Sequence, residues 1–253
     1  LSSSSAASDV YKRQECAVDM GQYTIVNLCY TAIPDANFEA ALDTLGYDDI
    51  SGDGQVPTNT IETLTSLDVS GKNISDITGI EDFTSLQTLD IRDNTISALD
   101  VSNNTSLTSL KTQNNNLAAI DVSNLTNLVL LNIAQNSITS LDVSNNTLLS
   151  ELYGASNSIT SVDLSNNPNL TIIRLNTNAL ESLNVQNGNN TAITTFAING
   201  NPNLTCVLVD DAAYSTTNWT VVDAQTIFNE VVCYEEYTAC LLYTSPSPRD
   251  KRQ

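Results

Sequence analysis

Hydrophobic and polar positions repeat every twenty-one residues through the middle of this chain. In the copy at 86–101, LQTLDIRDNTISALDV, leucines, isoleucines and one asparagine hold fixed places that recur in the other copies. A single copy cannot bury its apolar face, so neighbouring copies must stack and share one core. The other copies begin at Leu64 (divergent), Leu107, Leu128, Leu149, Leu170 and, after a two-residue insertion, Ile193.

Each copy is expected to contain two short strands and little helix. The first strand carries the innermost column of the core, formed by Leu89, Leu110, Leu131, Leu152 and Ile173. The next column holds Ile91, Ile133 and Leu175, with Thr112 and Gly154 as weak points. A second strand is expected at 99–101, 120–122, 141–143 and 162–164. Ser-Asn-Asn turns follow several of these, and asparagine tolerates the left-handed backbone that such corners need.

This spacing matches the leucine-rich-repeat template L-x-x-L-x-L-x-x-N-x-L. It predicts a right-handed, curved leucine-rich-repeat solenoid, formally of the α/β class, with mostly β coils and a short N-terminal capping helix. The template asparagines should form a structural ladder, in which each buried amide bonds the backbone of its own turn and of the next coil. They are Asn94, Asn115, Asn136, Asn157, Asn178 and Asn201.

The segments that flank the repeats have the character of caps. Residues 34–46 predict a helix with Asp35 as N-cap and Gly46 as stop, and with one apolar face. That face comprises Phe38, Ala41, Leu42 and Leu45. The expected organisation is an upstream linker at 15–33, an N-terminal cap at 34–63, about seven coils at 64–203, and a C-terminal cap at 204–239 with the only tryptophan, Trp219.

The outermost segments, 1–14 and 240–253, are interpreted as translated sequencing adapters. Back-translation of Asp9–Gln14 gives a DNA whose reverse complement encodes Cys240 to Thr244, so the two ends can form one inverted repeat. A natural tail, the alternative, would leave this relation unexplained. Adapter sequences lie outside any argument about the fold, and we therefore expect a metagenomic fragment of a longer protein.

Charge and composition exclude several functions. Without the adapter segments, residues 15–239 hold four basic and twenty-seven acidic residues, a formal charge of −23. Such a surface repels nucleic acid and favours divalent cations or basic partners. No apolar run is long enough to cross a membrane. The chain has no histidine, which excludes Ser-His-Asp and Cys-His catalysis and histidine-ligated metal sites. A carboxylate-pair hydrolase stays a formal alternative, but the acidic residues show no marked pair, so no enzyme is expected.

Two acidic features allow a cation or a structural interpretation. The loop D-I-S-G-D-G resembles the first half of an EF-hand, with Asp49, Ser51 and Asp53 as candidate calcium ligands. Its twelfth position is Thr60 in place of glutamate, so an ordinary turn is favoured. The column Asp100, Asp121, Asp142 and Asp163 places carboxylates about 5 Å apart on adjacent coils. Hydrogen bonding of each carboxylate within its own turn is favoured there over cation binding.

Three stretches carry a more specific resemblance: IPDANFEAALDTLGYDD, SLDVSGKNISDITGIEDFTSLQTLD and the repeated LDVSNNT. They resemble leucine-rich-repeat surface proteins of marine Bacteroidota, and NPNLTCVLVDDAAYSTTNWT resembles the segment that closes such arrays. The resemblance covers about residues 32–233. It departs at Lys72, in place of the first ladder asparagine, and at Gly154. It implies a secreted protein, extracellular or on the outer cell surface.

The candidate binding residues lie on the outward, concave side of the first strands. Three of the four basic residues at 15–239 are in this patch, together with an aromatic and two aliphatic side chains, a mixture typical of recognition surfaces. Drift on an unselected face is the alternative. The patch comprises Asp90, Arg92, Lys111, Leu130, Asn132, Tyr153, Ile172 and Arg174, with Ala197 at its end. Two functions stay open: an adhesion module that binds a protein or glycan, and a structural spacer, cation-binding or not, that carries a catalytic domain.

The cysteines generate the first testable prediction. Seven coils at about 4.8 Å each separate the caps by roughly 30 Å, far beyond the ~7 Å limit between the Cα atoms of a disulfide. The expected pairs are therefore Cys206–Cys233 and Cys16–Cys29, although Cys16 could instead pair with a cysteine further upstream. Peptide mapping without reductant of protein made in an oxidising compartment should find Cys206 linked to Cys233. Recovery of both as free thiols would contradict the pairing.

Overall fold

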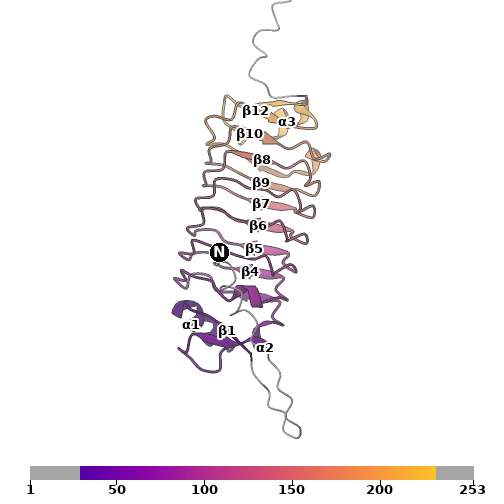
Figure 1. Ribbon diagram of the computed structural model, residues 1–253. Coiled ribbons are helices and arrows are strands. Elements are labelled where there is room, and N and C mark those ends of the chain that lie inside the picture. Colours follow the sequence, from indigo (N-terminus) through magenta and orange to yellow (C-terminus); the bar gives the residue numbers. More distant parts are fainter. Residues whose placement is uncertain (1–28, 232–253) are drawn as a thin grey trace, which may run out of the picture.

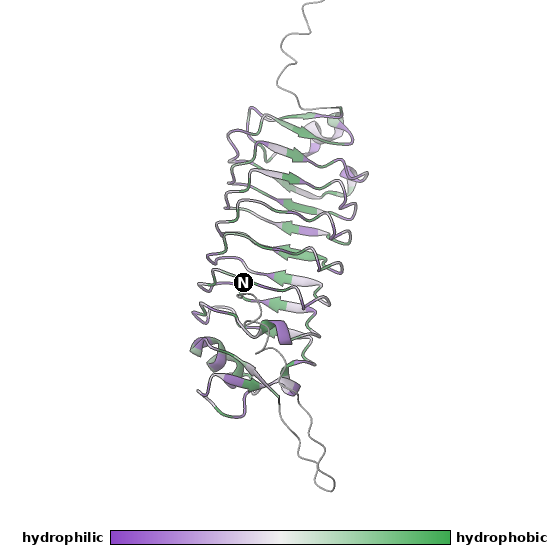
Figure 2. Cartoon of the chain, viewed as in Figure 1, coloured by the Kyte–Doolittle hydropathy of each residue, from purple (hydrophilic) through white to green (hydrophobic). Residues whose placement is uncertain are grey.

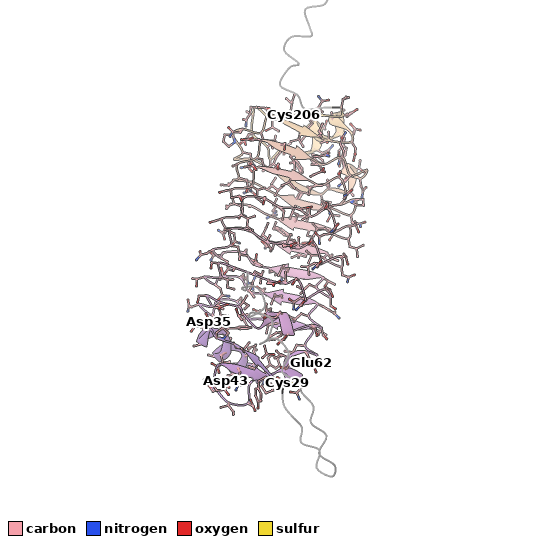
Figure 3. All side chains as sticks on the ribbon, in the orientation of Figure 1. Cys29, Asp35, Asp43, Glu62 and Cys206 are labelled. Carbon is pink, nitrogen blue, oxygen red and sulfur yellow. The ribbon has the colours of Figure 1, made fainter. Side chains whose placement is uncertain are left out.

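The structure, a computed structural model, describes residues 29–231 (Figure 1). The expected adapter segments, Cys16 and Cys233 lie outside this range, so what the sequence predicts about them stays a prediction. Within the described range the chain winds through a parallel β-solenoid of about eight turns, as the repeat predicts. Cys29 and Cys206 lie at opposite ends of this stack (Figure 3), consistent with separate pairing partners for the two.

One strand from each repeat joins a parallel, seven-stranded sheet along one side of the stack (Figure 1). Equivalent repeat positions pair in register, so Leu89, Leu110 and Leu131 face one another across successive coils. The expected first strand is therefore confirmed in every copy. The strands are β3 (Ser66–Asp68), β4 (Thr88–Asp90), β5 (Ser109–Lys111), β6 (Leu130–Asn132), β7 (Glu151–Tyr153), β9 (Ile172–Arg174) and β11 (Thr195–Ala197).

The second sheet is shorter than expected. It contains β8 (Ser161–Asp163), β10 (Ser182–Asn184), β12 (Cys206–Leu208) and β13 (Ile227–Asn229), in the order β13-β12-β10-β8. The prediction of a second strand was wrong for 99–101, 120–122 and 141–143. In the last two segments the carbonyls of Val122 and Val143 accept hydrogen bonds from their own turn and from a buried asparagine of the next coil. That use of the carbonyls favours a turn over a strand.

The core is a continuous apolar column between the two sides of the stack. Figure 2 shows the stacked strands mostly as hydrophobic and the surrounding loops mostly as hydrophilic. The predicted innermost column, from Leu89 to Ile173, is fully buried. Each such side chain contributes about 1.5–3 kcal/mol through the hydrophobic effect.

The two expected weak points do not interrupt the core. A Cβ atom on Gly154 would lie 2.9 Å from Leu175 Cδ2, so the neighbouring leucine already occupies that space. Thr112 is fully buried, and its hydroxyl donates to the Asn132 carbonyl at 3.4 Å. Both substitutions are therefore accommodated by adjacent groups, and the prediction of weak packing was wrong.

The template asparagines form a hydrogen-bonded ladder through the stack. The Asn136 amide nitrogen donates to the carbonyls of Thr112 and Ile133, and its oxygen accepts the Leu117 N–H at 3.0 Å. Asn136 therefore bonds the preceding coil, whereas the sequence predicts bonds to the next coil. The same bonds, to the coil before and to the residue three positions back, recur at Asn94, Asn115, Asn157, Asn178 and Asn201.

Left-handed backbone occurs at a different corner from the one expected. Within the described range, the residues of the Ser-Asn-Asn turns do not have positive φ. The left-handed residue is instead the one directly before each ladder asparagine. These are Asp93, Asn114, Gln135, Ser156 and Thr177, with φ between 55° and 58°, and then Gly200. A non-glycine residue at such a position costs roughly 1–2 kcal/mol.

A second buried asparagine column was missed by the sequence analysis. The last asparagine of the Ser-Asn-Asn turn points inward at Asn104, Asn146 and Asn167, all with no exposed surface. Its amide nitrogen donates to two carbonyls of the preceding coil, those of Val122 and Leu125 in the case of Asn146. The recurrence of this asparagine was visible in the repeats, but it was attributed to turn preference alone.

The N-terminal cap is held to the first coil by one carboxylate. Helix α1 (Ala36–Thr44) begins after Asp35, whose Oδ1 accepts the N–H groups of Asn37 and Phe38. The other oxygen of Asp35 accepts the N–H groups of Ser75 and Asp76, which belong to the first coil. Figure 3 shows Asp35 at this end of the molecule.

The rest of this end consists of a two-stranded sheet and two short helical segments. Strand β1 (Tyr30–Ala32) pairs antiparallel with β2 (Gln55–Pro57), followed by α2 (Thr58–Ile61), and a 3-10 helix, η1 (Ile80–Asp82), comes after β3. Phe38, Ala41 and Leu42 are buried as predicted. Leu45 is 46% exposed, so its predicted place on the buried face was wrong, because the helix ends one residue earlier.

The C-terminal segment forms a further coil in addition to a cap. Val221 bridges to Ala197 of the first sheet and β13 extends the second, although 204–239 was expected to break the period. A 3-10 helix, η2 (Asn190–Ala192), lies directly before the copy that begins at Ile193, and α3 (Ala212–Asn218) covers this end. Trp219 is 3% exposed and stacks on Phe196 with ring centroids 4.1 Å apart.

The ladder predicts that substitution of a ladder asparagine destabilises the protein more than substitution of an exposed aspartate. Asn136→Ala should lower the free energy of unfolding by about 1–3 kcal/mol, because it leaves backbone groups of two coils unpaired. Asp142→Ala should cost clearly less, because the exposed carboxylate bonds only within its own turn, to Ser144. Urea titrations of both variants measure this difference. Equal losses would mean that the amide column does not stabilise the stack.

The cap predicts a specific acid sensitivity. Partial burial alone would raise the pKa of Asp35, but hydrogen bonds from Ser75, Phe38 and Asp76 lower it to about 2. A depressed folded-state pKa contributes stability above the unfolded value of about 3.9, and this stability is lost as pH falls toward 2. Asp35→Asn should therefore show a smaller fall in Tm between about pH 4 and pH 2 than the unchanged protein. Parallel pH profiles would contradict this assignment.

Candidate binding face

The structure places the predicted binding residues on or directly beside the outer side of the first sheet, most of them in one row. Inward side chains of each three-residue strand are buried, so the residues on either side of them point away from the core. We call these outward residues of β4, β5, β6, β7, β9 and β11 the first-strand face. In register order the row is Asp90, Lys111, Asn132, Tyr153, Arg174 and Ala197.

At one end of the row, a single carboxylate contacts two cations. Asp90 is only 5% exposed, and its oxygens lie 3.5 Å from Arg92 Nε and 3.9 Å from Lys111 Nζ. The same carboxylate accepts the Arg92 N–H at 3.3 Å. Arg92 and Lys111 therefore already have a partner within the face, and Asp90 is less accessible than an outward position suggests.

In the middle of the row, Tyr153 lies between an acid and a base. Its hydroxyl donates to Glu151 Oε2 at 2.8 Å, and Arg174 Cζ lies 5.7 Å from its ring centroid. Burial, followed by the hydrogen bond to the Glu151 carboxylate, raises the pKa of Tyr153. Glu151 was missed by the sequence analysis, although its register between Leu130 and Ile172 could be derived from the repeat.

The aliphatic and amide members of the predicted patch flank this group. Leu130 and Ile172 are the neighbours of Glu151 on β6 and β9. They are half-buried, whereas the sequence predicts that they are exposed. The Asn132 side-chain oxygen accepts the Ala134 N–H at 3.2 Å. The central part of the face thus combines a fixed aromatic ring, an exposed guanidinium and two aliphatic side chains.

The acidic column on the opposite side is structured by its own turns. Asp100, Asp121, Asp142 and Asp163 each accept the N–H of the serine two residues later, at 2.9–3.0 Å. The hydroxyl and amide of Ser123 lower the pKa of Asp121, and those of Ser144 lower the pKa of Asp142. These bonds fit the favoured interpretation of hydrogen bonding within the turn. A cavity of about 350 Å³ lies between two coils of this column, lined by Leu141, Asp142, Ser144, Ser161, Asp163, Ser165 and Asn166.

The loop considered as a calcium site forms turns. The Asp49 carboxylate accepts the Tyr30 hydroxyl at 3.0 Å, and the Asp53 carboxylate accepts the N–H and side-chain amide of Gln55. Between residues 29 and 231, no group of three or more acidic or cysteine side chains is placed to hold a metal ion. In the same range, no helix has the length and hydrophobicity needed to cross a lipid bilayer.

Comparison with known proteins identifies the fold. No family model matches the sequence, and no curated protein is significantly similar to it. Among solved structures, an internalin (InlF) of Listeria monocytogenes is 21% identical with a TM-score of 0.58, over 79% of this chain and 72% of the other. A leucine-rich-repeat protein of Leptospira interrogans is 20% identical with a TM-score of 0.52, over 69% of this chain and 47% of the other.

A third similar structure is the functional domain of InlJ from Listeria monocytogenes, which is 26% identical with a TM-score of 0.36. That match covers 79% of this chain and 61% of the InlJ domain. The chain thus spans less than two thirds of this domain and about half of the Leptospira protein. The similarity to the InlF and Leptospira structures shows that the fold is a leucine-rich-repeat solenoid.

Proposed function

We propose that this chain is a non-catalytic recognition module that binds a protein or glycan through its first-strand face, outside the cell or on its outer surface. The observation that carries the proposal is the group formed by Tyr153, Glu151 and Arg174 between two aliphatic side chains. The proposed location is supported by the similarity to an internalin and by the sequence resemblance to bacterial surface proteins. The marine Bacteroidota source rests on that sequence resemblance alone.

The composition of this face supports a role in recognition over the alternative that its residues vary without selection. Aromatic and arginine side chains contribute most of the binding energy at typical interfaces, and both are present at the centre of the row. Their geometry is constrained before any partner arrives, because Tyr153 is anchored by Glu151 and covered by Arg174. Preorganised side chains lose little conformational entropy on binding.

A structural spacer is the second candidate function. The observation that favours it is the regular acidic column, whose cavity between Asp142 and Asp163 offers two carboxylates and three serine hydroxyls to a cation. A spacer would require no recognition at the first-strand face. The two functions therefore predict sensitivity on opposite sides of the stack.

Paired variants on the two sides separate these functions. Tyr153→Ala with Arg174→Ala should abolish binding to any ligand captured from a glycan array or a random peptide display library, with a loss of stability below about 1 kcal/mol. Asp121→Asn with Asp142→Asn should leave that binding unchanged. The reverse pattern would assign the function to the acidic column and disprove the proposal.

A further inference from the structure

Two exposed hydrophobic side chains depart from the repeat in the same part of the array. Of the large hydrophobic residues exposed in the described range, only Val129 (40% exposed) and Leu148 (48% exposed) lie within the repeats at 64–203. Other coils have polar residues at the position of Val129, and at the position of Leu148 they have polar residues or, in the last copy, Ala192. The counterparts of Val129 are Gln87, Thr108, Ser150, Thr171 and Thr194, and those of Leu148 include Ser106, Asn127 and Asn169. The coil geometry thus does not require a hydrophobic residue at either position.

Both residues lie beside the central part of the first-strand face. Val129 directly precedes β6, and its carbonyl accepts the N–H groups of Ser150 and Glu151 at 2.9 and 3.1 Å. Leu148 is in the corner that leads into β7, two residues before Ser150. On the face itself, Leu130 directly follows Val129 in the chain, and Leu130 and Ile172 flank Glu151 in register.

Arg174 determines the charge that a partner must present. In contrast to Arg92 and Lys111, which contact Asp90, it forms no ion pair with a carboxylate among residues 29–231. Its side chain is exposed and packs over the Tyr153 ring. On a chain with a formal charge of −20, a carboxylate of a partner is repelled by most of the surface and attracted here.

We propose that Val129 and Leu148 extend the binding face around the corner of the stack, toward a protein partner with an apolar side chain beside a carboxylate. The apolar side chain would cover Val129, Leu148 and Leu130, while the carboxylate would pair with Arg174. Uncovered aliphatic surface next to an arginine fits the centre and edge of a protein interface. This inference rests on the proposed recognition function and names the partner of the same site.

The test selects peptides on the full chain from a random peptide display library. Enriched peptides should contain an aliphatic or aromatic residue next to Asp or Glu. Val129→Thr with Leu148→Asn should weaken their binding by about tenfold or more, and Arg174→Ala should weaken it likewise. These substitutions introduce residues that neighbouring coils already carry, and unchanged Tm values verify the fold. The matched control, Leu45→Asn with Ile50→Thr, alters equally exposed apolar residues outside the array and should have no effect.

Each other outcome overturns the extension. If Tyr153→Ala with Arg174→Ala abolishes peptide binding while Val129→Thr with Leu148→Asn does not, the extension is wrong and the proposed function stands. Insensitivity to both double variants removes both proposals. Enrichment of peptides without the paired apolar and acidic residues, or no enrichment at all, contradicts the partner chemistry. Self-association in sedimentation experiments that depends on Val129 and Leu148 would assign the corner to a second copy of the chain.

Discussion

From the second to the seventh copy of the repeat, the chain leaves the first strand through a left-handed residue, and the asparagine that follows supplies the hydrogen bonds that hold this bend. Gln135 has φ of 55°, and Asn136 then bonds its own turn and the preceding coil. A left-handed non-glycine residue costs roughly 1–2 kcal/mol, so the bend persists because the amide bonds and the buried leucines offset the strain. Since these six coils repeat the arrangement, the ladder sets the spacing and register of the stack that they form.

At each end of the stack that the structure describes, backbone N–H groups lack a neighbouring coil to which they could donate. A carboxylate accepts them at both ends. Asp35 accepts the Ser75 and Asp76 N–H groups of the first coil, and Asp223 accepts those of Gly200 and Asn201 near the last. With its interior and both ends constrained, the solenoid can vary most freely at outward positions. Tyr153, Arg174, Val129 and Leu148 all lie at such positions.

The repeat pattern predicted the features that periodic burial determines. It did not predict the features that depend on which donors bond a given backbone carbonyl. The buried column and the row from Asp90 to Arg174 follow from spacing alone, because equivalent positions stack in register. The absence of the expected second strands does not follow from spacing. It arises because the carbonyls of Val122 and Val143 accept hydrogen bonds from their turns and from buried asparagines. The contact of Asp90 with two cations and that of Tyr153 with Glu151 depend on side-chain conformations that spacing does not specify.

Hydrogen exchange measured residue by residue tests the central role of the ladder most directly. The amides of Ile96, Leu117, Ile138, Ile159 and Leu180 donate to ladder asparagines, whereas those of Ser102, Ser123, Ser144 and Ser165 donate to exposed aspartates. If the ladder holds the stack together, the first set exchanges only through global unfolding and the second set exchanges much faster. Similar rates in the two sets would show that the coils open locally at the ladder, and would contradict this account.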